Sequence, residues 1–131
     1  MKLVYSKELK VTEQHLDFNN HVNNVQYVHW VEEMAQEHWE LVKHLTPYQN
    51  DFWVLYDHHI HYKKQVFLGD IITIKTYPLP PEGLKQPRKV EFYCNGALMV
   101  DSKTMWILCD HDSKKVKKMS ADWLSDLEAK L

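Results

Sequence analysis

The stretch "LDFNNHVNNVQYVHWVEEM", from Leu16 to Met34, joins a polar segment to an apolar pattern of helical period. Its polar part holds one aspartate, four asparagines and a histidine, residue types that favour turns and helix caps because their short side chains compete for backbone hydrogen bonds. From Val25 to Leu45, apolar residues recur every three or four positions and form a broad face. The stretch therefore predicts a capped helix that ends before Pro47, preceded by more polar residues than capping requires.

Segments rich in β-branched and aromatic residues on both sides of this helix predict five strands. One strand is expected before the helix and four after it, at residues 3–12, 52–62, 68–77, 88–100 and 102–110. Ser120 is expected to cap a short amphipathic helix within residues 120–131. The fold class is therefore α+β, with an antiparallel five-stranded sheet wrapped around one long helix in a single domain, residues 1–131.

Composition and charge exclude several classes of function. The chain has 131 residues and a net charge of −2, so it has no basic field that would attract nucleic acid. Its apolar runs are too short for a secretory leader or a membrane span. Cys94 and Cys109 are too few for a disulfide framework, and the three glycines stand too far apart for a phosphate loop. We expect a reduced, cytoplasmic protein that binds neither nucleic acid nor membrane.

The segment D-F-N-N-H-V-N-N-V-Q-Y, Asp17 to Tyr27, resembles the active-site segment of hotdog-fold acyl thioesterases. It is most similar to the D-x-N-x-H-V-N-N-x-x-Y stretch of plant-type acyl-carrier-protein (ACP) thioesterases. Residues 60–76 and 98–120 resemble strands of the 4-hydroxybenzoyl-CoA thioesterase group, so the resemblance covers nearly the whole chain. It implies a hotdog fold, hydrolysis of acyl-CoA or acyl-ACP thioesters in fatty acid metabolism, and no metal or redox cofactor.

The resemblance also implies roles for individual residues. Asp17 is expected to be the general base or nucleophile, and Asn19 and His21 are expected to orient it or the attacking water. The backbone N–H of Asn24 is expected to polarise the thioester carbonyl, because the first helical turn has unpaired N–H groups and the positive end of the helix dipole. Contacts with the substrate, including the phosphates of CoA or an acidic carrier protein, are expected from Tyr27, His61, Lys63 and Lys64.

One departure from the plant-type pattern leaves alternatives open. The plant-type enzymes carry glutamates and a nearby cysteine where this chain has His61, Gln65 and Val66. Asp17 then remains the only acidic group of the expected site. A non-catalytic acyl-thioester binding protein and a hotdog enoyl-CoA hydratase are therefore alternatives to a hydrolase. Without the resemblance, Asp17 and the asparagines are explained by helix capping alone.

The segment "DHHIHY" offers a competing hypothesis, because Asp57, His59 and His61 alternate and so share one face of a strand. Imidazole and carboxylate groups in such a set could bind a transition metal. A polar strand face near a subunit interface is the simpler interpretation, and we expect no metal site. The exposed edge of a five-stranded sheet also predicts a homodimer, or a tetramer made of two dimers.

Overall fold

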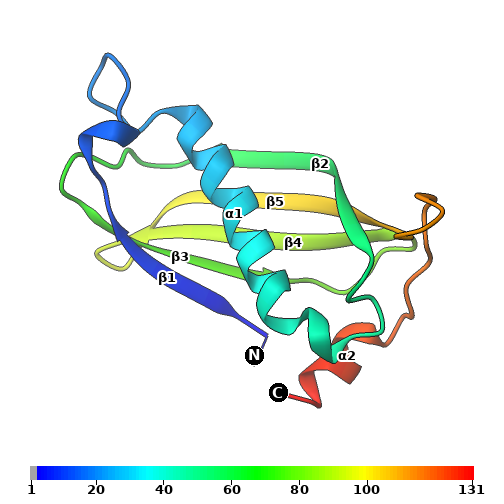
Figure 1. The fold of residues 1–131 in the computed structure, drawn as a ribbon. Coiled ribbons are helices and arrows are strands. Elements are labelled where there is room, and N and C mark those ends of the chain that lie inside the picture. Colours follow the sequence, from blue (N-terminus) through cyan, green and yellow to red (C-terminus); the bar gives the residue numbers. More distant parts are fainter. Residues whose placement is uncertain (1–2) are drawn as a thin grey trace.

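The structure is a computed structural model that describes residues 3–131, and it consists of one antiparallel sheet with one long helix across its face (Figure 1). The strand order is β1-β3-β4-β5-β2. The strands are β1 (Tyr5–Lys10), β2 (Phe52–Tyr62), β3 (Ile71–Pro78), β4 (Lys85–Cys94) and β5 (Ala97–Cys109). The helices are α1 (Asn24–Val42) and the short α2 (Trp123–Glu128), which lies near the C-terminal end of α1. The expected α+β hotdog architecture is confirmed.

Helix α1 is held on the sheet by one buried face. Its buried residues follow helical spacing and are Tyr27, Trp30, Val31, Met34, Ala35, His38 and Val42. Each large apolar side chain of this kind contributes roughly 1.5–3 kcal/mol when it is fully removed from water. At the C-terminal end, residues Lys43–Leu45 continue as a 3-10 turn, so the predicted end of the helix is confirmed with a change of helix type. Among residues 3–131, neither helix has the length and apolar character needed to cross a membrane.

The predicted strand at residues 88–100 was wrong, because the chain reverses direction within it. Asn95 and Gly96 form a two-residue turn, with φ angles of 51° and 79°, between the paired residues Cys94 and Ala97. Asn-Gly is favoured in such turns because both positions require positive φ, which suits the twist of the flanking strands. The segment predicted separately at residues 102–110 is therefore the second half of β5.

The predicted N-cap at Ser120 was also wrong. Helix α2 begins at Trp123 and its N-cap is Asp122. The Ser120 carbonyl accepts a hydrogen bond from the Trp123 N–H at 3.2 Å, and the Ser120 hydroxyl accepts one from the Asp122 N–H at 3.3 Å. Ser120 thus forms the turn that leads into α2, and the helix buries Trp123 and Leu127 as its amphipathic pattern predicted.

The core consists of two apolar clusters along α1. The first lies under the N-terminal half of the helix and includes Trp30, Met34, Ile72 and Phe92. The second lies toward the C-terminal end and joins α1 to α2. Its buried members include Val42, Tyr48, Leu108 and Trp123.

A band of buried polar residues, which we call the polar band, consists of His38, Thr76 and Arg88. Arg88 Nη1 lies 2.9 Å from both His38 Nδ1 and Thr76 Oγ1. Because a guanidinium only donates hydrogen bonds, His38 Nδ1 must accept, and the imidazole is neutral. Burial and the nearby Arg88 charge lower the pKa of His38 to about 4. Burial also lowers the pKa of Arg88 to about 10, which leaves the guanidinium charged at neutral pH.

The neutral state of His38 predicts a loss of stability in acid. An unfolded histidine titrates at 6.5 and folded His38 at about 4, so the unfolded chain binds more protons between these values. Stability falls as pH falls from 6.5 through 4, and this contribution becomes constant only about one pH unit below the folded pKa. The loss reaches about 3 kcal/mol at pH 4 and about 3.5 kcal/mol in total, since the shift spans 6.5 − 4 = 2.5 pKa units and each unit corresponds to about 1.4 kcal/mol.

Urea unfolding of the wild type and of His38→Asn between pH 4 and 7.5 measures this contribution. The asparagine side chain offers an oxygen near the position of Nδ1 but does not titrate. Between pH 7.5 and pH 4, we expect the free energy of unfolding to fall by about 3 kcal/mol less in the variant than in the wild type. Parallel curves for the two proteins would show that His38 does not titrate in this way.

Candidate active site

The loop of residues 17–21 is closed by the Asp17 side chain. Asp17 Oδ1 accepts hydrogen bonds from the backbone N–H groups of Asn19, at 2.9 Å, and His21, at 3.2 Å. The Asp17 N–H donates to the His21 carbonyl at 2.8 Å, and Leu16 and Val22 form an isolated β-bridge at the base of the loop. This loop lies at the N-terminal end of α1, at the opposite end of the helix from α2 (Figure 1). The carboxylate is therefore held in a fixed position in front of the helix.

The two oxygens of Asp17 have different environments. Oδ1 is occupied by the two backbone donors, whereas Oδ2 accepts no hydrogen bond from any part of residues 3–131. The Asp17 residue is only half-buried, so Oδ2 has access to water or a ligand. One oxygen thus fixes the carboxylate, and the other remains free to take a proton.

The first turn of α1 contains a free backbone donor at Asn24. Asn23 is the N-cap, and its side-chain oxygen accepts a hydrogen bond from the Val25 N–H at 2.9 Å. The Asn23 carbonyl accepts from the Gln26 N–H at 2.9 Å. The Asn24 N–H has no hydrogen-bond partner within the described residues, and Asn24 is exposed. Together with the positive end of the helix dipole, this N–H favours a partially negative oxygen.

Asn19 and His21 hold Asp17 through their backbones. No side-chain hydrogen bond joins either residue to the Asp17 carboxylate. The His21 ring instead lies edge-on to Phe67, with 6.1 Å between ring centroids. The structure thus brings both residues to Asp17, and their side chains remain available to a ligand.

Tyr27 is placed in the core. It is only 4% exposed, and its ring contacts those of Trp30, Tyr62 and Phe92. Burial, together with Tyr62 and the Asp70 charge, raises the pKa of Tyr27 to about 12. The predicted contact with substrate stays a prediction, and the role that the structure supports for Tyr27 is packing.

Lys63 and Lys64 lie at the same end of the molecule as the Asp17 loop. They follow the end of β2, where Tyr62 packs on Tyr27 at 5.4 Å between ring centroids. Both backbone N–H groups donate to the Met99 carbonyl, at 2.9 and 3.0 Å, and both side chains are exposed. The two ammonium groups are therefore free to meet an anionic ligand near the start of α1.

His61 is not brought to this site within one chain. Residues alternate along β2, and Ile60 packs on the first apolar cluster. His61 consequently lies on the opposite face of β2, where it is exposed and contacts His59 at 5.0 Å between ring centroids. Asp57 is also exposed. Over residues 3–131, no group of three histidine, cysteine, aspartate or glutamate residues is arranged to hold a metal ion, so the metal hypothesis gains no support.

Three further residues bear on the departure from the plant-type pattern. Val66 is 1% exposed and belongs to the first apolar cluster, whereas Gln65 is exposed. Asp70 is a second carboxylate at this end of the molecule that the sequence analysis missed. Its Oδ2 accepts the Phe67 N–H at 2.9 Å, and its charge acts on Tyr27. The turn signal Gly69-Asp70 before β3 could have identified it as a turn residue.

His58 was also missed. It lies on the inner side of β2, and its Nε2 atom is buried without a hydrogen-bond partner among the described residues. Burial lowers the pKa of its imidazole. The alternation of β2 separates His58 from Asp57, His59 and His61, and strand periodicity applied to His58 itself would have placed it inside.

Apolar side chains are exposed on the Asp17 loop, on the first turn of α1 and on the segment that contains Phe67, whose ring meets that of His21. Phe18 is fully exposed, and Val25, Phe67 and Leu68 are each at least half exposed. Large apolar groups that gather at the surface in this way commonly mark a site for a ligand or another chain. We call these four residues the apolar rim.

Comparison with known proteins identifies the family. Residues 2–127 match the family model of the acyl-ACP thioesterase N-terminal domain. A comparison with curated protein sequences gives no match.

Solved structures with the same fold include three informative relatives. The YbaW probable thioesterase from Escherichia coli is 22% identical, with a TM-score of 0.80 over 94% of this chain and 96% of that one. The SAV2348 protein from Staphylococcus aureus, in complex with CoA, is 14% identical, with a TM-score of 0.76 over 98% and 84%. An acyl-ACP thioesterase from Bacteroides thetaiotaomicron is 13% identical, with a TM-score of 0.82 over 94% of this chain and 52% of that one.

At these identities the structural likeness establishes the fold, while the match of the family model extends over nearly the whole sequence. The chain therefore belongs to the acyl-ACP thioesterase family, whose members hydrolyse thioesters.

Proposed function

We propose that this protein hydrolyses acyl-CoA or acyl-ACP thioesters at the N-terminal end of α1, with Asp17 as the general base for a water molecule. One observation carries the proposal. Asp17 Oδ1 is fixed by two backbone donors while Oδ2 is free, and the free N–H of Asn24 opens the helix that follows the same loop. A base and an oxyanion donor are the two groups that thioester hydrolysis requires most.

The reaction proceeds by water attack on the thioester carbonyl. Asp17 Oδ2 accepts a proton from water as the oxygen–carbon bond forms, and the Asn24 N–H donates to the developing oxyanion. The tetrahedral intermediate then collapses, the carbon–sulfur bond breaks, and the proton on Asp17 passes to the leaving thiolate. The products are a carboxylic acid and the free thiol of the carrier.

The surroundings of Asp17 suit a carrier with a phosphate group. The ammonium groups of Lys63 and Lys64 are exposed at this end, where they can pair with the phosphates of CoA or with an acidic carrier protein. The apolar rim offers surface for the acyl chain and the pantetheine arm. The CoA bound to the S. aureus relative is consistent with CoA as one carrier.

A mechanism with one carboxylate accounts for the missing glutamates and cysteine. Val66 stands in the core and Asp70 is tied to the Phe67 N–H of its own turn. Val66 has no acidic group, and we assign the role of base to Asp17 because its loop leads directly into α1. Because the oxyanion is stabilised by the helix N-terminus, the single carboxylate Asp17 suffices for turnover.

Asp17→Asn is expected to lower turnover by about 10²- to 10⁴-fold, the usual contribution of a general base. The asparagine oxygen still accepts the N–H groups of Asn19 and His21, so the loop and the overall stability are retained. The measurement is thiol release from a panel of acyl-CoA and acyl-ACP thioesters of different chain lengths, read with a thiol reagent.

Asp110→Asn is the matched control, since Asp110 Oδ1 also accepts two backbone N–H groups in a loop, from Asp112 and Ser113. We expect this variant to retain wild-type turnover.

If Asp17→Asn retains most of its activity, Asp17 is a loop-closing residue and the mechanism is wrong. If the wild type releases no thiol but binds the thioesters, the alternative of a binding protein is correct, and loss of enoyl absorbance without thiol release would identify a hydratase.

We also propose that the active form is a homodimer, or a tetramer of two dimers. Strand β2 is an edge of the sheet, and its exposed residues include Val54, Tyr56 and Tyr62. An unpaired edge of this length, 11 residues, is a template for pairing with a second chain.

The buried, unpaired cysteines Cys94 and Cys109 support the inference of a reducing, cytoplasmic location.

Sedimentation of the protein at micromolar concentration tests the dimer. We expect the mass of two or four chains, and we expect activity to fall on dilution below the dissociation constant. A stable monomer with full activity would contradict this proposal.

A further inference from the structure

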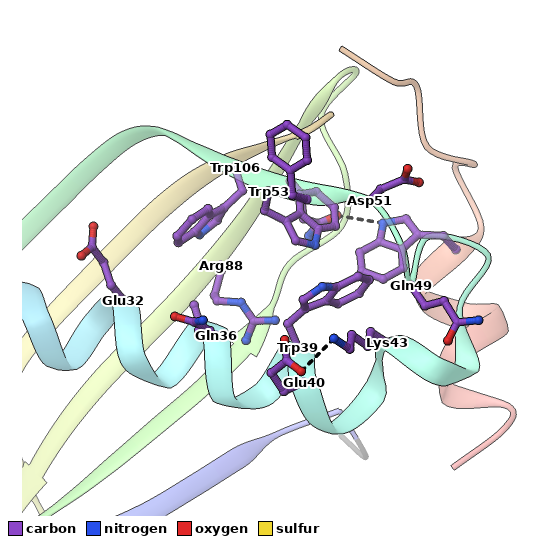
Figure 2. A pocket seen from close by; sticks show the side chains of 14 residues that line it. Glu32, Gln36, Trp39, Glu40, Lys43, Gln49, Asp51, Trp53, Arg88 and Trp106 are labelled. Atoms are coloured by element: carbon purple, nitrogen blue, oxygen red, sulfur yellow. Dashed lines mark hydrogen bonds and ion pairs between the residues drawn. The ribbon is translucent and has the colours of Figure 1, made fainter. Parts of the chain in front are cut away.

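A cavity of about 440 Å³ lies between the C-terminal half of α1 and the sheet. Its volume is in the range of small-molecule sites, about 300–1,000 Å³. Glu32, Gln36, Trp39 and Glu40 of helix α1 line it together with Lys43 of the following turn, and Figure 2 shows Trp53, Arg88 and Trp106 on the sheet across from the helix. Gln86 of β4 and Trp123 of α2 complete this part of the lining. The Asp17 loop lies at the other end of the helix (Figure 1). The cavity is therefore separate from the proposed active site.

Arg88 is the one arginine in the sequence, and it is 9% exposed. Its hydrogen-bond partners, His38 and Thr76, are both neutral. No carboxylate within residues 3–131 forms a salt bridge with it. A charge that is buried without a counter-ion is costly, which makes the guanidinium an unusual group for the interior of a protein.

The free donors of Arg88 belong to one edge of the guanidinium. Nη1 uses its two hydrogens on His38 and Thr76, and Nε and Nη2 have no partner among the described residues. Neither of these nitrogens is fully enclosed, since the one fully buried side-chain atom without a partner in residues 3–131 is His58 Nε2. Figure 2 shows the Arg88 side chain extending from β4 toward Gln36 and Trp39. The Nε–Nη2 edge is the one that binds a carboxylate through two parallel hydrogen bonds.

The walls of the cavity are aromatic. Four of the five tryptophans of the chain line it, at positions 39, 53, 106 and 123, together with Phe52. The Trp39 and Trp53 rings are perpendicular with centroids 5.6 Å apart. The Trp123 indole N–H donates a hydrogen bond to Gln86 Oε1 at 2.9 Å, so the polar group of this indole is already paired within the protein. These walls favour an apolar body on the ligand.

Acidic residues at the cavity are mostly neutralised by lysines. Glu40 pairs with Lys43 at 2.8 Å, and Asp51 pairs with Lys117 at 2.8 Å. Glu32 has no lysine partner among the described residues, and Figure 2 shows its carboxylate directed away from Arg88. One uncompensated carboxylate at the edge of the cavity disfavours a dianion such as a phosphate ester and leaves room for a single negative charge.

We propose that this cavity binds an apolar monocarboxylic acid, with the carboxylate on the Nε–Nη2 edge of Arg88 and the hydrocarbon or aryl body against the tryptophans. From Asn24 to Trp39 the helix rises roughly 22 Å, at about 1.5 Å per residue, so the bound acid does not occupy the Asp17 site. The acids released by thioester hydrolysis have this chemistry. The binding itself does not depend on the proposed hydrolysis.

Tryptophan fluorescence of the wild type tests the proposal, because the cavity contains most of the indole rings. Octanoate is titrated against octanamide, and 4-phenylbutanoate against 4-phenylbutanamide, at neutral pH. We expect each acid to bind at least about tenfold more tightly than its amide, the discrimination that one charge-assisted pair provides. Equal binding of acid and amide, or no binding of either, overturns the proposal without reference to any variant.

Four variants locate the carboxylate. Arg88→Met is expected to abolish the preference for acid over amide. Arg88→Gln, which removes the charge but keeps an amide donor toward His38 and Thr76, replaces it if the first variant does not fold and is expected to show the same loss. Lys43→Gln removes a positive charge from the same cavity and leaves Glu40 without its lysine, so it is expected to weaken acid binding while the preference for acid over amide remains. Glu32→Gln is expected to tighten acid binding. A preference that survives in both Arg88 variants, or that disappears in Lys43→Gln, overturns the assignment.

The same titration in Asp17→Asn separates the two proposals. We expect unchanged binding of the acids, because Asp17 is at the other end of α1. If acid binding is lost in this variant, the acids occupy the Asp17 site and the inference about the cavity is wrong. Failure of thioester hydrolysis, by contrast, leaves the wild-type acid and amide titrations unaffected.

Discussion

Burial of one face of α1 against the sheet is the interaction on which the rest of the structure depends. Seven residues of the helix are buried, and they contact strands that are far apart in the sequence. This packing fixes the axis of α1, and therefore the place where its first N–H groups emerge. Because the Asp17 loop is connected directly to that end, the position of the Asp17 carboxylate is determined by apolar contacts of Trp30, Val31 and Met34.

The two ends of α1 have different chemistry. At the N-terminal end, exposed backbone donors and a half-buried carboxylate face solvent, which suits a reaction with water. Toward the C-terminal end, the helix covers a set of tryptophans and a guanidinium that has no counter-ion within residues 3–131. The polar band holds Arg88 in this second region. His38 Nδ1 accepts a hydrogen bond from Arg88, which it can do only while its imidazole is neutral.

The general fold could be predicted from the sequence because it depends on periodicity. Helical spacing identified α1, and runs of β-branched residues identified the strands. The boundary between β4 and β5 was misplaced because high strand propensity on both sides of Asn95-Gly96 outweighed a turn signal of only two residues. Ser120 was misplaced because serine and aspartate are both good caps, and tertiary contacts of Trp123 decide where the helix begins.

Individual site residues were predictable to a lesser degree. The loop at Asp17 followed from a local pattern, and the structure places it at the predicted end of the helix. His61 was assigned to substrate contact by resemblance, and the alternation of β2 turns it away from α1. Arg88 could not be recognised as a candidate from the sequence. Its importance depends on its burial without a counter-ion among the described residues, and no sequence pattern records which carboxylates lie near it in the folded chain.

The pH dependence of kcat/KM for the best thioester tests the central claim, that a carboxylate at the helix N-terminus activates water. Aspartates ordinarily titrate near pH 4 and imidazoles near pH 6.5. If a carboxylate is the base, kcat/KM stays nearly constant from about pH 9 down to about pH 5 in the wild type and in His21→Ala. If His21 is the base, kcat/KM of the wild type falls below about pH 6.5 and this fall is absent from His21→Ala, which would contradict the assignment of Asp17.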